Sequence, residues 1–145
     1  MGIPCKHGDH YYFSYNSGLQ NQAVRYKIKE PNTYKISKED ALAGTEVFID
    51  PNQLAADGTA SIGSASWSDD GKYMAYNINL AGSDWATIRI RDAATCKDLD
   101  DTLKWVKFSG SSWLKDSSGF IYSKFDAPVG KGEGEAGTET EKLKF

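Results

Sequence analysis

Cysteine, histidine and proline are scarce in this chain of 145 residues, which has 2 cysteines, 2 histidines and 4 prolines. Cys5 and Cys96 lie far apart with no CxxC pair, so we expect two free, buried thiols rather than a disulfide. His7 and His10 have only Asp9 as a nearby third ligand, which favours surface histidines over a metal site. We therefore assign no metal and no cofactor to the chain.

Long hydrophobic runs and an excess of positive charge are also missing. No stretch reaches the roughly 20 apolar residues of a membrane span, and the first residues lack the charged-then-apolar order of a signal peptide. The formal net charge of -3 offers phosphate backbones no basic surface. We expect a cytoplasmic protein with neither nucleic acid nor membrane among its partners.

Signatures of catalysis are absent as well. The nucleophile motif Gly-x-Ser-x-Gly does not occur, although serines are numerous. The string "GEGEAG" at 132–137 satisfies GxGxxG only formally, because no helical pattern follows it and Glu133 and Glu135 would repel a phosphate. We predict a flexible loop there and assign no catalytic residue.

Aromatic residues and alternating patterns are plentiful, with Trp 4, Tyr 8 and Phe 6. In "WATIRIR" at 85–91, apolar and polar positions alternate as in a strand. In "VRYKIK" at 24–29, Val24, Tyr26 and Ile28 alternate with three basic residues, which predicts a strand with one solvent-facing side. No window carries a helical stripe of normal length, so the fold class is predicted to be all-β.

One frame is repeated along the chain. Trp67, Asp70 and Tyr76 of "SWSDDGKYMAY" recur in "SWLKDSSGFIY" at 112–122, and "DHYYFSYN" at 9–16 is a weaker copy. Between the two strong copies lie strand signals at 64–67, 73–79, 85–91 and 103–108, which together predict a four-stranded antiparallel meander. A period of about 40–50 residues with four strands is typical of β-propeller blades. We predict a partial propeller of about two to three blades.

The predicted blades have approximate limits, with blade one at about 3–50, blade two at about 62–109 and the start of blade three at about 110–145. The repeated aromatic residues have a structural interpretation, because large rings at strand period ordinarily fill the space between blades. We therefore expect Trp67, Trp113, Tyr76 and Tyr122 to be core residues.

Long strings in the chain resemble the propeller domain of the prolyl oligopeptidase family, serine peptidases that cut short peptides after proline. They are "YYFSYNSGLQNQAVRY" at 11–26, "VFIDPNQLAADGTASIGSASWSDDGKYMAY" at 47–76, "GSDWATIRIRD" at 82–92 and "KWVKFSGSSWLKDSSGFIY" at 104–122. The resemblance implies a seven-bladed propeller that caps an α/β-hydrolase domain and filters substrates by size. That hydrolase domain, with its Ser, Asp and His, is absent from this sequence.

Two site residues follow from the resemblance. In the family, the Asp of "SDW" and the Phe of "VKFS" face the active-site cavity, and they match Asp84 and Phe108 here. The resemblance thus places both in a substrate pocket or domain interface. From the residues alone, Asp84 is equally a hairpin carboxylate and Phe108 one more core aromatic residue of a strand.

Three functions remain open on the sequence. The first is the gating propeller of a cytosolic prolyl oligopeptidase, non-catalytic by itself, whose partners are the parent α/β-hydrolase domain and short proline-containing peptides. The second is a non-enzymatic propeller scaffold or binding module. The third is the propeller of a family member that joins peptide ends, because the choice between hydrolysis and macrocyclisation depends on the missing domain.

Overall fold

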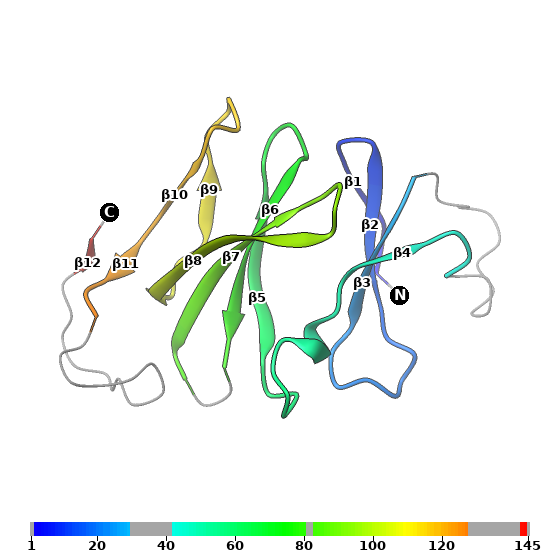
Figure 1. Ribbon diagram of the computed structural model, residues 1–145, viewed down its shortest axis with the longest axis horizontal. Coiled ribbons are helices and arrows are strands. Elements are labelled where there is room, and N and C mark those ends of the chain that lie inside the picture. Colours follow the sequence, from blue (N-terminus) through cyan, green and yellow to red (C-terminus); the bar gives the residue numbers. More distant parts are fainter. Residues whose placement is uncertain (1, 30–41, 81–82, 128–142, 145) are drawn as a thin grey trace.

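The computed structural model describes residues 2–29, 42–80, 83–127 and 143–144. Two four-stranded antiparallel sheets stand side by side, each with its strands in sequence order (Figure 1). The first sheet comprises β1 (Cys5–His7), β2 (His10–Tyr15), β3 (Val24–Ile28) and β4 (Glu46–Ile49). The second comprises β5 (Ser61–Trp67), β6 (Tyr73–Asn79), β7 (Trp85–Asp92) and β8 (Lys97–Lys107).

A third group of strands follows the second sheet. It contains two antiparallel pairs, β9 (Ser111–Trp113) with β10 (Phe120–Tyr122) and β11 (Lys124–Phe125) with β12 (Leu143–Lys144). The described helical structure is a single 3-10 turn, η1 (Pro51–Gln53), whose N-cap Asp50 accepts a hydrogen bond from the Asn52 amide. No helix in the described ranges is long and apolar enough to cross a membrane. The prediction of an all-β fold built from four-stranded antiparallel meanders is confirmed.

The sequence repeat is a structural repeat. Trp67 pairs with Met74 across the β5–β6 hairpin, and Trp113 pairs with Phe120 in the same way across β9–β10. The contacts between successive sheets repeat too, because the Tyr12 ring lies 4.4 Å from that of Trp67, and the Tyr73 ring lies 6.4 Å from that of Trp113. The recurring tryptophan therefore packs each inner hairpin against the sheet before it.

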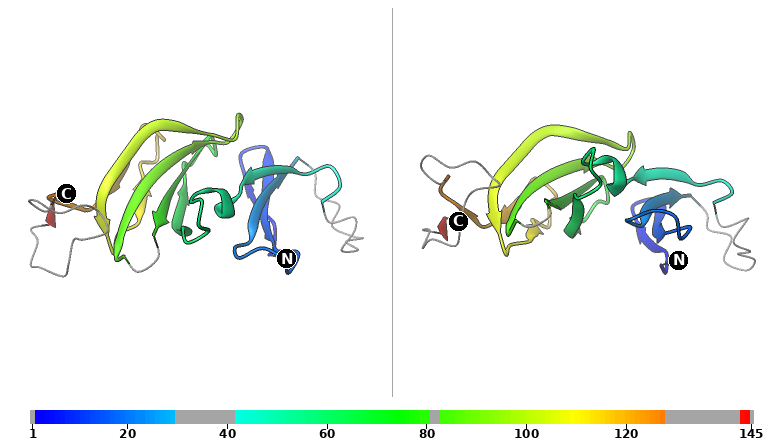
Figure 2. Two further views of the ribbon diagram at one scale, coloured as in Figure 1. Left: turned by 60° about the horizontal axis from the view of Figure 1, so that its bottom comes forward. Right: turned by 90° about the horizontal axis from the view of Figure 1, so that it is seen from below.

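Two apolar clusters fill the space between the sheets. The cluster between the first and second sheets buries Tyr12, Phe48, Ile49, Met74 and Tyr76, with Trp67 packed against it. The cluster on the other face of the second sheet buries Ala75, Ala86, Ile88 and Val106, with Trp113, Phe120 and Tyr122 packed against it. Figure 2 shows β5 to β8 lying between the other two groups of strands. Both faces of the second sheet are therefore covered, as expected of a blade within a stack.

A polar network also joins the first two sheets. Arg91 of β7 donates from Nε to the Phe48 carbonyl of β4 at 2.6 Å, and from a terminal nitrogen to Asp98 at 2.8 Å. The buried Tyr76 hydroxyl donates to the second oxygen of Asp98 at 2.9 Å. Burial is the main cause that raises the pKa of Tyr76, and the Asp98 charge adds to it, so the hydroxyl remains a donor at physiological pH.

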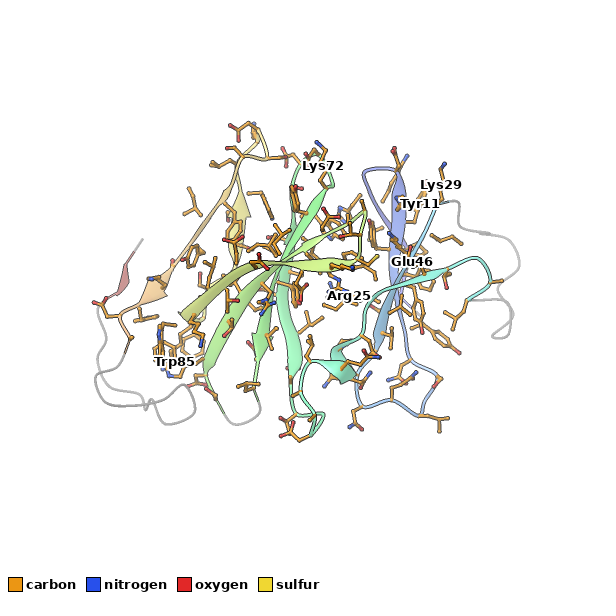
Figure 3. The ribbon with its side chains drawn as sticks, viewed as in Figure 1. Tyr11, Arg25, Lys29, Glu46, Lys72 and Trp85 are labelled. Atoms are coloured by element: carbon orange, nitrogen blue, oxygen red, sulfur yellow. The ribbon has the colours of Figure 1, made fainter. Side chains whose placement is uncertain are left out.

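The structure corrects the prediction for strand 24–29. Lys27 was expected on a solvent-facing side but is only 5% exposed, and Arg25 of the same side contacts the Met74 sulfur at 3.7 Å. Arg25, labelled in Figure 3, lies between the two sheets. The face that carries the basic residues is the one that the second sheet covers, so alternation found the strand but misjudged its environment.

Three further expectations differ from the structure. Cys5 and Cys96 are free as predicted, but Cys5 is exposed and Cys96 only partly buried. His7 is not a simple surface histidine, because its ring stacks on Trp67 with the ring centroids 4.4 Å apart, and burial lowers its pKa. Strand β8 begins at Lys97 rather than near Leu103. The prediction missed its first half because most side chains there are polar and exposed, so no apolar alternation marks the strand.

Candidate functional site

The two residues that the sequence singled out, Asp84 and Phe108, lie at the same edge of the second sheet, namely the one where β7 begins and β8 ends. Asp84 directly precedes β7, and Phe108 directly follows β8. Because β7 and β8 are antiparallel, the start of one meets the end of the other, and Trp85 pairs with Lys107. Trp85, labelled in Figure 3, marks this edge, which lies opposite the β5–β6 hairpin in Figure 1.

The Phe108 ring projects away from the sheet. The residue is 86% exposed, and its backbone adopts a left-handed conformation with φ of 50°. Both features are unfavourable for a bulky aromatic residue. The alternative of a core aromatic residue is wrong for Phe108, because alternation stops at the strand end and the left-handed residue turns the side chain out of the sheet.

Hydrogen bonds of the preceding residue, Ser83, hold the backbone at Asp84. The Ser83 amide donates to the Leu80 carbonyl at 3.1 Å, and the Ser83 hydroxyl accepts from the Trp85 amide at 3.1 Å. These bonds fix the backbone on both sides of the carboxylate, whose side chain remains 55% exposed. The backbone at Asp84 is therefore fixed, and the carboxylate is open to a ligand.

Asn77 of β6 fixes the segment that follows Phe108. Its side chain is buried, and its amide nitrogen donates to the Ser109 carbonyl at 2.8 Å. The Ser109 hydroxyl in turn accepts from the Ser123 amide at 3.1 Å, which connects this segment to the third group of strands. The crossover after β8 is therefore tied to two neighbouring elements.

Together these elements enclose an open hollow of about 430 Å³. Its walls combine one aromatic ring, one carboxylate, two amide side chains and several hydroxyls, and the residues are Ser64, Asn77, Asn79, Ser83, Asp84, Ala86, Phe108, Ser109 and Gly110. The ring offers apolar contact, while the polar groups offer hydrogen-bond acceptors and donors. This mixture suits an amide-rich ligand that carries an apolar side chain, such as a peptide.

Lys107 adds a cation to this edge. Its side chain is only 10% exposed, and its Nζ lies 4.0 Å from Asp84 Oδ2 and 5.0 Å from the centre of the Trp85 ring. Sequence reasoning missed both Lys107 and Asn77. Lys107 belongs to the same string, "VKFS", as Phe108, but nothing in the alternation signals that a lysine there is buried.

The two histidines do not build a second site. His7 is engaged with Trp67, and within the part of the chain that the structure describes no group of three or more His, Cys, Asp or Glu side chains is arranged to hold a metal ion. The string "GEGEAG" lies outside the described residues. The hollow at Asp84 and Phe108 is therefore the candidate functional site.

Comparison with known proteins gives a family for this arrangement. Residues 1–145 match the family model described as prolyl oligopeptidase, N-terminal beta-propeller domain. A prolyl endopeptidase of Elizabethkingia meningoseptica is 47% identical over 128 residues, covering 88% of this chain and 16% of the relative. The dual function macrocyclase-peptidase POPB of Galerina marginata is 43% identical over 129 residues, covering 81% of this chain and 18% of the relative.

A solved structure agrees with these matches. Prolyl oligopeptidase B from Galerina marginata, bound to a 35mer hydrolysis and macrocyclization substrate, superposes with a TM-score of 0.75 and 36% identity. The superposition covers 90% of this chain and 20% of that structure. The chain thus spans less than a fifth of the length of the two curated relatives.

Proposed function

The chain belongs to the prolyl oligopeptidase family, within its N-terminal β-propeller domain, and we propose that it is the substrate-gating part of a cytosolic serine peptidase that cleaves short peptides after proline. The single observation that carries the proposal is the hollow shared by Asp84 and Phe108 at one edge of a blade. An exposed ring beside a fixed carboxylate gives a peptide both apolar contact and an acceptor for its N–H groups. The exposed free thiol of Cys5 supports a reducing compartment.

We assign the chemistry to a partner rather than to this chain. Nucleophilic cleavage needs a positioned serine with a base and an oxyanion hole, and the sequence offers no nucleophile motif. The partner is an α/β-hydrolase domain, whose serine attacks the prolyl bond while the propeller selects which peptides reach it. The purified 145-residue chain should therefore leave a Gly-Pro reporter peptide intact, and turnover that survives removal of contaminating peptidases would contradict this assignment.

The gating role is tested in a chimera. This chain replaces the matching segment of the Elizabethkingia meningoseptica prolyl endopeptidase, and Phe108→Ala is compared with Leu114→Ala, which trims a second exposed apolar residue outside the hollow. Loss of apolar contact worth about 1–3 kcal/mol should lower kcat/KM for longer prolyl peptides roughly tenfold or more, with the melting temperature nearly unchanged. Equal kinetics for the two variants, or a large loss of stability with unchanged kinetics per folded molecule, would show that Phe108 does not contribute to substrate selection.

Macrocyclisation is a second candidate, supported by the 43% identity to a dual function macrocyclase-peptidase. A transferase of this kind would pass the acyl-enzyme to the amino end of the same peptide instead of to water. Mass spectrometry of the products of the natural protein separates the two, because a cyclic product is lighter by one water than its linear hydrolysis product. Linear products alone would leave hydrolysis as the function.

A further inference from the structure

Lys107 connects the two candidate site residues to each other. Its Nζ lies 5.6 Å from the centre of the Phe108 ring and 4.0 Å from Asp84 Oδ2. We propose that Lys107 is a positioning and specificity residue: its ammonium holds the Phe108 ring at the hollow and offsets the Asp84 charge, so that the hollow accepts uncharged peptide segments. This inference rests on the peptide-gating function proposed above.

The buried Trp85 ring fixes the position of the Lys107 side chain. Trp85, its cross-strand partner, is 5% exposed and makes edge contacts with Trp105 at 5.5 Å and Phe125 at 5.8 Å. The ammonium rests on this ring at 5.0 Å. A cation over an indole face is electrostatically attracted to it, most strongly where water is excluded. The packed Trp85 ring therefore holds the Lys107 ammonium in place beside its exposed neighbours, Asp84 and Phe108.

Phe108 is the residue that needs such support. Its left-handed backbone and its 86% exposure are both costly for phenylalanine, and costs of this kind gather at functional sites. An exposed ring that rotated freely would offer a peptide no defined surface. The ammonium limits that freedom, because the cation is attracted to the ring face.

Lys107 also sets the charge of the hollow. Asp84 is the one carboxylate among the residues that line it, and the Lys107 ammonium lies beside that carboxylate. Without the ammonium, the hollow would be anionic and would favour cationic peptide segments over acidic ones. A lysine that served only to cover Trp85 would have no such effect on peptide choice.

The experiment compares Lys107→Met, which keeps the length of the side chain, with Lys107→Arg, which keeps its charge. Lys97→Met, an exposed lysine at the other end of β8, is the matched control. In the natural protein that contains this sequence, kcat and KM are measured for peptides with one prolyl bond and an alanine, lysine or glutamate in the upstream segment.

We expect Lys107→Met to raise KM for the alanine peptide about threefold to tenfold with kcat within about twofold, and to shift preference toward the lysine peptide by a similar factor. Lys107→Arg should restore both values, and Lys97→Met should change neither. A Lys107→Met variant that matches the wild type, or an arginine variant as impaired as the methionine one, would overturn the proposal.

A second measurement does not depend on peptidase activity. In protein labelled at lysine Cε, the Lys107 Hε protons should resonate upfield because the adjoining Nζ lies over the Trp85 and Phe108 rings, and Phe108→Ala should reduce that shift. A wild-type protein that cleaves no prolyl peptide would refute the proposed function, while this shift would still decide the contact. A resonance that Phe108→Ala leaves unchanged would refute the role of Lys107, because any remaining shift would then come from the Trp85 ring alone.

Discussion

Lys27 of β3 donates from Nζ to the carbonyl oxygen of Ala93 at 2.9 Å, across the boundary between the first and second sheets. The same ammonium donates to the Ala94 carbonyl at 3.2 Å and lies 3.2 Å from Glu46 Oε2. Burial by itself would lower the pKa of Lys27, but hydrogen bonds to Cys96 and Glu46 raise it above its usual value. With these partners, the buried charge of Lys27 stabilises the contact between the first and second blades.

Replacing Lys27 by Met should therefore destabilise the fold. The change leaves two carbonyls of the β7–β8 turn without their donor, which costs about 1–3 kcal/mol. Urea unfolding measures the loss, and Lys29→Met, an exposed lysine just after β3, is the control. Because the folded pKa is raised, the contribution of Lys27 is present below its unfolded pKa and is lost only as the pH rises through the folded value. A Lys27→Met variant as stable as Lys29→Met would show that the hydrogen bonds of Lys27 do not stabilise this contact.

Trp67 is expected to contribute most of the apolar attachment at this boundary. Its ring lies 4.4 Å from those of His7 and Tyr12 and 5.4 Å from that of Phe48, all in the first sheet. Trp67→Ala should cost about 3–5 kcal/mol of unfolding free energy, as for other large packed rings. Leu19→Ala, at a residue that is 95% exposed, should change stability little. Similar unfolding midpoints for the two variants would show that the blades are joined elsewhere.

Gly71 is required where the turns of two blades touch. Its φ is 70°, and a Cβ there would overlap the backbone of Gly8 in the β1–β2 turn. Gly71→Ala should cost about 2 kcal/mol or more, because the left-handed backbone alone costs about 1–2 kcal/mol for a residue with a Cβ. Gly18→Ala separates the two causes, since Gly18 also has a positive φ but has open space around it. Thermal unfolding should rank Gly71→Ala below Gly18→Ala, and the reverse order would exclude the contact.

The hydrogen bonds of Asp70 predict that the free energy of unfolding falls in acid. The Ser68 hydroxyl donates to its carboxylate at 2.7 Å and the Lys72 amide at 3.1 Å, which lowers its pKa from 3.8 to about 2. A carboxyl whose folded pKa is depressed stabilises the fold above its unfolded pKa, and this contribution is lost as the pH falls through the folded value. Unfolding midpoints between pH 6 and pH 2 should therefore fall less steeply in Asp70→Asn than in wild type.

The control for this pH dependence is the neighbouring residue. Asp69→Asn removes an adjacent exposed charge but leaves the hydrogen bonds of Asp70 in place. Its midpoints should follow the wild-type curve in shape. Parallel curves for wild type and Asp70→Asn would mean that this turn contributes nothing to the acid sensitivity.

Local sequence patterns were sufficient to predict several strands and the repetition of the blade. Alternation in "WATIRIR" and the repeated Trp67 and Trp113 frames depend on local chemistry, since side-chain period and turn residues act over a few positions. The structure adds the register, which pairs Trp67 with Met74 and Trp113 with Phe120 at equivalent places in the two frames. The family resemblance identified Asp84 and Phe108, which the structure brings to one hollow.

The burial of polar side chains depends on packing between sheets, which local patterns do not describe. Lys27 and Lys107 both occupy positions that alternation assigns to solvent, yet one lies under the second sheet and the other between Trp85 and Asp84. A strand pattern describes two faces but does not say what covers each of them, because the covering residues are far away in the sequence. In a stack of blades both faces are covered, so a lysine stem can pack on aromatic rings while its ammonium reaches carbonyls and carboxylates of the next element.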